Sequence, residues 1–245
     1  MDISESGPCV LCNKPSTAGC LDCNDLLYCS EACLLADKPH HALLCHSFSQ
    51  NPPTSTTGNR HVRAFSFPAD TTEPKLVWVP VSGFADPDTG ISFQEADIVQ
   101  FFPPTVVPQT LHAERNSVRH RESNSMLEIW HTAAQAGSAN RCIESLAKGK
   151  EGDGLFYDWK GGVLVLAMTR PTGFMVDPGA YKNAQARDFR DAVDFLVDYG
   201  NTAHAQSVRE TLNTLGASTS TAERSNRSYE PYGVTGMGSI VSEME

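Results

Sequence analysis

Seven of the eight cysteines of this chain lie before position 46, and two adjacent histidines lie among them. Cysteines that serve as core residues would be scattered along the chain, and a disulfide framework would normally follow a secretion signal. The opening residues "MDISESGPCV" contain no basic start, apolar run or small-residue cleavage site. We therefore expect a reducing, intracellular compartment, and metal binding is the leading explanation of the cluster.

The spacing within this cluster suits tetrahedral metal coordination. A C-x2-C turn brings two thiolates to one ion, and residues four apart on a helix project from the same face. Eight donors make two four-coordinate sites with no position left for water, which is typical of structural zinc. The candidate ligands are Cys9, Cys12, Cys20, Cys23, Cys29, Cys33, His41 and Cys45.

Two alternatives stand beside this interpretation. His40 could replace His41 as a ligand, although His41 is the histidine that lies four residues before Cys45. The cysteines could also be buried or redox-active thiols that cluster by chance. The separation of four residues from Cys45 favours His41 over His40, and the regular spacing of the pairs favours metal over a chance cluster.

The cluster resembles the MYND-type zinc finger, whose pattern is C-x2-C, C-x2-C, Y-C-S-x2-C and H-x3-C, and "YCSEAC" from Tyr28 matches its central signature. The resemblance implies a cross-braced module that two Zn²⁺ ions stabilise, because so short a segment cannot bury a sizeable core. It assigns Cys9, Cys12, Cys29 and Cys33 to one ion, and Cys20, Cys23, His41 and Cys45 to the other. It also implies a module that binds protein or peptide partners.

Two departures limit what the resemblance implies. The peptide groove of MYND modules uses a glutamine and a tryptophan where this chain has Leu34 and Lys38. Losing an amide donor and an aromatic platform should weaken such a groove. The methyltransferases that carry this finger inside a SET domain are also disfavoured, since only eight residues precede Cys9.

Charge and hydropathy narrow the classes of partner. The chain has 19 Lys and Arg residues against 29 Asp and Glu residues, a net charge of -10, which disfavours nucleic acid because binding to phosphates needs clustered cations. No apolar run approaches the roughly 20 residues that cross a bilayer. A soluble protein in the nucleus or the cytoplasm is expected, and no run of Lys and Arg resembles an import signal.

The remainder of the sequence predicts an α+β fold with a mixed sheet and packing helices. "HVRAFSF", "KLVWVPV" and "ADIVQFF" have the composition of strands, and "GGVLVLAM" from Gly161 is apolar enough for the centre of a sheet. Helices are expected at Ser123–Leu146, split near Gly137, at "AQARDFRDAVDFLVDYG" with a stop at Gly200, and at Ala203–Leu215. The expected organisation is a zinc finger at 1–46, a linker at 47–60, an α+β domain at 61–216 and a disordered tail at 217–245. The second region is similar to the C-terminal part of fungal MYND-containing proteins.

Other candidate residues have ordinary structural interpretations. The acids of the last helix, Asp188, Asp191, Asp194 and Asp198, are expected to face water. "LHAERNSVRHRE" from Leu111 could be an anion or metal site, but a solvated basic face is favoured. Cys142 is expected to be a buried thiol rather than a nucleophile, and His131 a packed or surface histidine.

The leading hypothesis is a non-enzymatic interaction protein, an adaptor or transcription-related regulator, built on a two-zinc finger. The alternative is an enzyme whose active site lies in the second domain, for example a protein-modifying enzyme that uses the finger to dock its substrate. Nucleic-acid binding is a third hypothesis, which the acidic composition opposes.

Overall fold

The computed structural model describes residues 7–16, 18–52, 60–132, 137–148, 155–172 and 177–201. The chain divides into two compact units, Met1–Thr202 and Ala203–Glu245, and every described residue belongs to the first. The helix expected at Ala203–Leu215 and the disordered tail expected at 217–245 lie outside the described residues.

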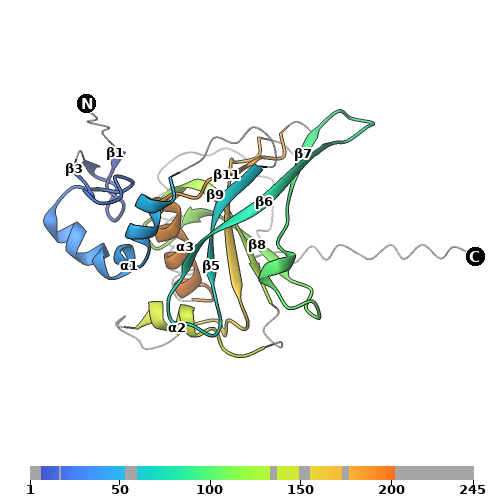
Figure 1. Ribbon diagram of the computed structural model, residues 1–245. Helices are drawn as coiled ribbons and strands as arrows, with labels where there is room; N and C mark the ends of the chain where they lie inside the picture. The colour runs from blue at the N-terminus through green and yellow to red at the C-terminus, as the bar shows by residue number, and fades with distance from the viewer. Residues whose placement is uncertain are drawn as a thin grey trace, which may run out of the picture. The chain divides into compact units, whose positions relative to one another are not determined.

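The described unit is α+β, as the sequence predicts (Figure 1). The strands are β1 (Gly7–Pro8), β2 (Pro15–Ser16), β3 (Ala18–Gly19), β4 (Leu27–Tyr28), β5 (Arg60–Phe67), β6 (Lys75–Ala85), β7 (Ser92–Ala96), β8 (Gln109–Asn116), β9 (Arg121–His131), β10 (Val163–Met168) and β11 (Tyr181–Lys182). The helices are α1 (Glu31–Gln50), the 3-10 turn η1 (Val99–Phe101), α2 (Arg141–Ala147) and α3 (Ala186–Asp198). In the part of the chain that is described, no helix is long and apolar enough to cross a membrane.

The longer strands form a seven-stranded sheet in the order β7-β6-β5-β10-β9-β8, with β11 also paired to β10. Every pairing between these strands is antiparallel, so the expected mixed sheet is wrong. The expectation for "GGVLVLAM" is confirmed, because β10 lies between β5 and β9 and all six of its residues are buried. Val163 of β10 pairs with Phe67 on one side and with His131 on the other.

Strand β9 replaces the first part of the helix expected over Ser123–Leu146, and among the described residues of that range only those of α2 are helical. Leu127 and Ile129 face the helices, whereas Met126 packs in the cluster on the opposite side of the sheet. Because both faces of this strand are buried, its sequence lacks the alternation that marks a half-exposed strand. Its apolar residues therefore fit a helical period by chance.

A second correction concerns "ADIVQFF", which was expected to be a strand. Its first residue ends β7, and the segment then turns into η1. Phe102 is 8% exposed and packs against the sheet on the side away from the α-helices. The apolar run thus reflects a turn that buries Phe102 rather than an extended strand.

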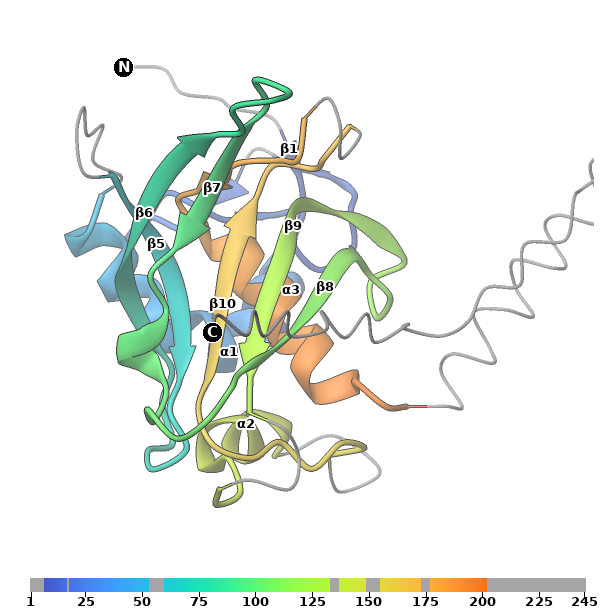
Figure 2. The ribbon, with the colours of Figure 1, turned by 90° about the vertical axis from the view of Figure 1, so that its right-hand side faces the viewer.

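The three α-helices cover one face of the sheet, as Figures 1 and 2 show. The main core lies between them and the sheet. In it, Phe189 of α3 stacks on Phe67 of β5 at a centroid distance of 6.2 Å and contacts Phe65 in a tilted arrangement at 5.3 Å. The last turn of α1, residues 47–50, was expected to begin a linker. It is helical because Phe48, 5% exposed, packs edge-on against Phe65 in this core.

Candidate metal centre

The first candidate metal group contains four cysteines whose sulfur atoms all lie within 4.8 Å of one another: Cys9, Cys12, Cys29 and Cys33. Cys9 and Cys12 lie in the turn between β1 and β2, and Cys29 directly follows β4. Cys33 lies in the first turn of α1, where its N–H donates to the hydroxyl of Ser30, the N-cap residue, at 3.3 Å. The helix cap therefore positions a candidate ligand as well as starting the helix.

The second group contains Cys20, Cys23, His41 and Cys45, also within 4.8 Å. Cys20 and Cys23 lie in the turn between β3 and β4. His41 and Cys45 lie one helical turn apart on α1, on the same face. Helix α1 therefore supplies one candidate ligand to the first group and two to the second, so that it contributes to both groups.

An asparagine follows the second cysteine of each C-x2-C turn and closes that turn. Asn13 and Asn24 adopt positive φ values of 62° and 54°, a conformation that asparagine tolerates better than most residues. Their N–H groups donate to the carbonyls of Cys9 and Cys20 at 3.1 and 3.0 Å. This local geometry turns both thiols of each pair toward the same side.

The donor separations fit a tetrahedral zinc ion. With Zn–S bonds of about 2.3 Å, two thiolates on one ion lie about 3.8 Å apart. Cys12 Sγ lies 3.2 Å from Cys29 Sγ and 3.9 Å from Cys33 Sγ. In the second group, His41 Nε2 lies 3.2 Å from Cys20 Sγ and 3.7 Å from Cys23 Sγ. All eight cysteines of the chain are free thiols in this structure, so neither group is a set of disulfides.

The thiols of each group do not ionise alike in the absence of a cation. Burial raises the pKa of Cys9, but the backbone N–H groups that donate to it bring the pKa down to about 6. In the same group, hydrogen bonding to the Cys12 thiol and burial raise the pKa of Cys29 to about 12. In the second group the backbone likewise lowers the pKa of Cys20, although burial opposes it, while burial and the neighbouring Cys20 raise the pKa of Cys45. Deprotonating a whole group therefore calls for a bound cation.

A buried aspartate on α1 connects the metal groups to the rest of the unit. Asp37, 1% exposed, lies between the ligands of the two groups on α1. The hydroxyl of Tyr28, the residue before a cysteine ligand, donates to Asp37 Oδ2 at 2.7 Å. On its other side, Arg190 Nη1 of α3 lies 3.4 Å from Asp37 Oδ1. The module is therefore joined to α3 by a buried ion pair.

This ion pair continues into a larger buried network between α3 and the β8–β9 hairpin. Arg190 also pairs with Asp194 one turn further along α3. Asp194 accepts from Arg119 Nε at 2.9 Å, and Asn116 donates to Asp194 at 3.0 Å. Arg121 Nη2 lies 2.5 Å from Asp191 Oδ1, with side chains 6% and 1% exposed. Almost every charge of the network is thus buried and paired.

Two sequence expectations are corrected by this network. Asp188, Asp191 and Asp194 do not face water, since they are between 0% and 2% exposed. The "LHAERNSVRHRE" segment is not a uniformly solvated basic face either, because Arg121 is 7% exposed and pairs with α3. Three aspartates at intervals of three residues lie on one face of a helix. This spacing was the sequence signal that could have indicated a shared set of partners for these acids. The basic partner segment lies about 70 residues away, so pattern analysis could not connect the two.

The other candidate residues lie away from the metal groups. His40 projects toward α2, where its Nε2 lies 3.3 Å from the Leu146 carbonyl oxygen, rather than joining a metal group. Cys142 is fully buried, and burial raises its pKa to about 12. His131 is 3% exposed and packs edge-on against Trp159, and its Nδ1 lies 2.9 Å from the Thr132 carbonyl oxygen. The buried or packed roles expected for Cys142 and His131 are confirmed.

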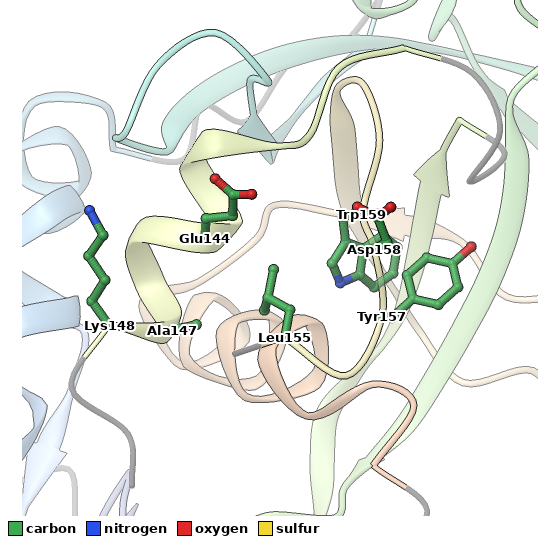
Figure 3. Close-up of a pocket in the computed structure, with 7 residues that line it drawn as sticks. All are labelled: Glu144, Ala147, Lys148, Leu155, Tyr157, Asp158 and Trp159. Carbon is green, nitrogen blue, oxygen red and sulfur yellow. The ribbon is translucent and has the colours of Figure 1, made fainter. Parts of the chain in front are cut away.

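A cavity of about 520 Å³ lies between α2 and the segment that leads to β10. Figure 3 shows Leu155 between α2 on one side and the aromatic pair Tyr157 and Trp159 on the other. The charged residues that line the cavity, Glu144, Lys148 and Asp158, lie at its rim. Asp158 already pairs with Lys160 at 2.8 Å. This cavity lies apart from both metal groups and shares no residue with them.

The fold and the site together define a class: an α+β protein with a cysteine-rich module that contains two four-donor groups and is joined to α3 by a buried ion pair. A family model described as "Ecl1: TORC1 inhibitor Ecl family" matches residues 9–235. The chain belongs to this family. The comparisons with curated proteins and with solved structures found no match.

The family match overturns the resemblance to MYND proteins. It begins at Cys9, so it includes all eight candidate ligands, and it extends through the second region that was compared with fungal MYND-containing proteins. The reason for the error is physical. Ligand spacing is set by the demands of a tetrahedral ion, so different families can share it without sharing ancestry or partners.

Proposed function

We propose that this chain is a non-enzymatic regulatory protein that binds two structural zinc ions and inhibits TORC1 through contacts with a protein partner. The observation that carries the metal part is the pair of four-donor groups, each compact enough for one ion. Four protein donors complete a tetrahedral ion and leave no open position for substrate or water. The inhibitory part is supported by the description of the family to which the chain belongs.

Zinc is the ion that these donors favour. One group offers four thiolates, and the other offers three thiolates and an imidazole. Such donor sets select zinc among common cellular cations, whereas magnesium and calcium prefer oxygen ligands. Two ions would hold together a segment whose strands are only two residues long.

The bound ions would also fix the surface that the module presents. Asp25 Oδ2 of the module accepts from the N–H of Ala186 in α3 at 2.9 Å, and the side chain of Asn13 donates to the Arg119 carbonyl at 3.2 Å. Each contact comes from a loop next to a candidate ligand. Metal loss would therefore release these contacts and alter the face shared by the module and α3.

The non-enzymatic part of the proposal rests on the side chains outside the two groups. Burial holds the pKa of Cys142 near 12, so its thiol would stay protonated at neutral pH. Burial lowers the pKa of His131, whose ring is enclosed by Tyr157 and Trp159. Among the described residues, these two are packing residues rather than a nucleophile and its base.

Native mass spectrometry of the intact recombinant protein tests the metal proposal. We expect two zinc ions on the wild type and fewer on Cys29→Ser, which removes one donor. Cys142→Ala is the matched control, because it removes a cysteine outside both groups and should keep two ions. One zinc ion or none on the wild type would refute the proposal.

The regulatory proposal needs a cellular measurement. Wild-type protein expressed in cells should reduce phosphorylation of a TORC1 substrate, Cys142→Ala should do the same at equal protein level, and Cys29→Ser should not. Unchanged phosphorylation with the wild type would contradict TORC1 inhibition. Full inhibition by Cys29→Ser would show that the metal module is not needed for it.

A further inference from the structure

The sheet has a second face, which lies opposite the three α-helices and toward the viewer in Figure 2. η1 and the segment that leads from it to β8 lie on this side and connect the two edge strands, β7 and β8. The face is apolar at its centre, where buried side chains of β5, β6, β9 and β10 form a second cluster. Val77, Ile98, Phe101 and Trp130 border this cluster and are only partly buried.

A carboxylate lies in this apolar face. Glu128 of β9 is 8% exposed, and its Oε2 accepts from Trp130 Nε1 at 2.8 Å and from the Tyr181 hydroxyl at 2.7 Å. Its other oxygen, Oε1, lies 3.7 Å from Nε2 of His112, whose side chain is half exposed. Two donors therefore hold Glu128 in place, while Oε1 is directed toward an exposed neighbour and can accept a further donor.

The stretch that supplies most of the frame is acidic. From Leu76 to Glu114 the sequence contains no lysine or arginine, and it contains five acids: Asp86, Asp88, Glu95, Asp97 and Glu114. This stretch includes β7, η1 and most of β6 and β8. Glu95 and Asp97 are exposed beside the partly buried apolar border. A cation approaching this stretch would meet no lysine or arginine within it, and Arg115 at the end of β8 already pairs with Glu122 at 3.0 Å.

Apolar side chains are exposed along the same stretch. Val99 of η1 is 74% exposed and Val107 is 87% exposed. Phe84 near the tip of the β6–β7 hairpin is 54% exposed and stacks on Phe93 at a centroid distance of 5.6 Å. Exposed apolar residues among acids complement a partner that presents both apolar and basic side chains.

We propose that this second face of the sheet, framed by β7, η1 and β8, is a docking surface for a basic amphipathic segment of a partner protein. The apolar side chains of the segment lie against Trp130, Phe101 and Val99. A lysine or arginine of the segment pairs with Glu128 Oε1. The inference deepens the proposed function, because it names the chemistry of a partner through which a regulator would act, but it does not depend on the zinc ions.

A synthetic amphipathic helix of leucine and lysine is the probe, and its counterpart with glutamate in place of lysine is the control peptide. Binding to the full-length protein is measured by fluorescence anisotropy, and the site is mapped by hydrogen exchange. Glu128→Gln removes the central charge and keeps an oxygen acceptor. Glu95→Gln with Asp97→Asn neutralises the frame at exposed positions where folding should be unaffected. Asp70→Asn with Glu73→Gln makes the same charge change at exposed positions in the β5–β6 turn.

We expect the lysine peptide to bind and the glutamate peptide not to bind. Glu128→Gln and the frame variant should each weaken binding about tenfold, a loss typical of a close charge pair, whereas the β5–β6 variant should stay within about twofold. New exchange protection should fall in residues 92–101 and 109–113.

Three results would overturn the proposal: no binding at about 100 µM peptide, equal weakening by the frame and β5–β6 variants, or protection elsewhere. A stronger affinity for anionic lipid vesicles or for duplex DNA than for the lysine peptide would also overturn it. Native mass spectrometry on the same sample separates the two proposals. Absence of peptide binding to protein that holds two zinc ions would refute the docking surface alone.

Discussion

Replacing Arg190 by methionine should destabilise the whole described unit, because this residue neutralises two buried carboxylates on different elements. Asp37 and Asp194 are each 1% exposed, and Arg190 itself is 4% exposed. Methionine keeps much of the side-chain volume but removes the charge. Breaking a buried ion pair from one side costs about 3–5 kcal/mol, since the remaining charge is left without compensation. Asp194 retains Arg119 as a partner, so most of the cost arises at Asp37.

The measurement is urea unfolding of zinc-loaded protein, followed by circular dichroism. We expect a loss of about 3 kcal/mol for Arg190→Met, a large part of the roughly 5–15 kcal/mol that stabilises an ordinary domain. Arg115→Met is the matched control, because the Arg115–Glu122 pair is 64% and 52% exposed and should contribute less than about 1 kcal/mol.

A double variant identifies the cause of the loss. Asp37→Asn removes the charge that Arg190→Met leaves unpaired, and its amide can still accept from Tyr28. Adding Asp37→Asn to Arg190→Met should therefore restore about 1–2 kcal/mol relative to Arg190→Met alone. The reasoning would be refuted if Arg190→Met cost no more than Arg115→Met, or if the second change made the protein still less stable.

Three further predictions concern other parts of the fold. Burial raises the pKa of Asp194, but its arginine partners bring the pKa down to about 2 from the ordinary value of 3.8. The ionised side chain therefore stabilises the fold by about 2 kcal/mol above about pH 5, and this stabilisation is lost as the pH falls toward 2. The difference in unfolding free energy between wild type and Asp194→Asn should narrow over that range. Asn140→Ala removes the N-cap of α2 and a donor to two buried carbonyls, and it should lower the unfolding free energy by about 3 kcal/mol. Gly161→Ala should cost clearly more than Gly90→Ala in thermal melts: both glycines have positive φ, but an added Cβ would lie 2.6 Å from Thr132 Oγ1 at position 161 and would meet nothing within 4 Å at position 90. Equal losses at the two glycines would show that the close approach of Thr132 to Gly161 is unimportant.

The sequence determined the features that depend on local spacing. The eight candidate ligands could be identified from the sequence because metal geometry constrains residues that are close along the chain. Their division into two groups, which the MYND resemblance implied, is the division that the structure shows, although the resemblance itself named the wrong family. The central strand β10 and the helix α3 were also predictable, because a continuous apolar run and a 3.6-residue period are local signals.

Only the tertiary structure decided which surfaces of these elements are buried. Residues Asp191 and Asp194 of α3 resemble a solvated face until the β8–β9 hairpin, about 70 residues earlier in the chain, brings Asn116 and Arg121 against them. The same long-range packing makes β9 a strand. Its pairing with β8 and β10 provides partners for the backbone N–H and C=O groups, which in a helix would hydrogen-bond to one another. Contacts between distant segments leave no periodic trace in either one. For that reason the two donor groups were predictable, whereas the buried charge network around α3, which reaches α1 through Asp37, was not.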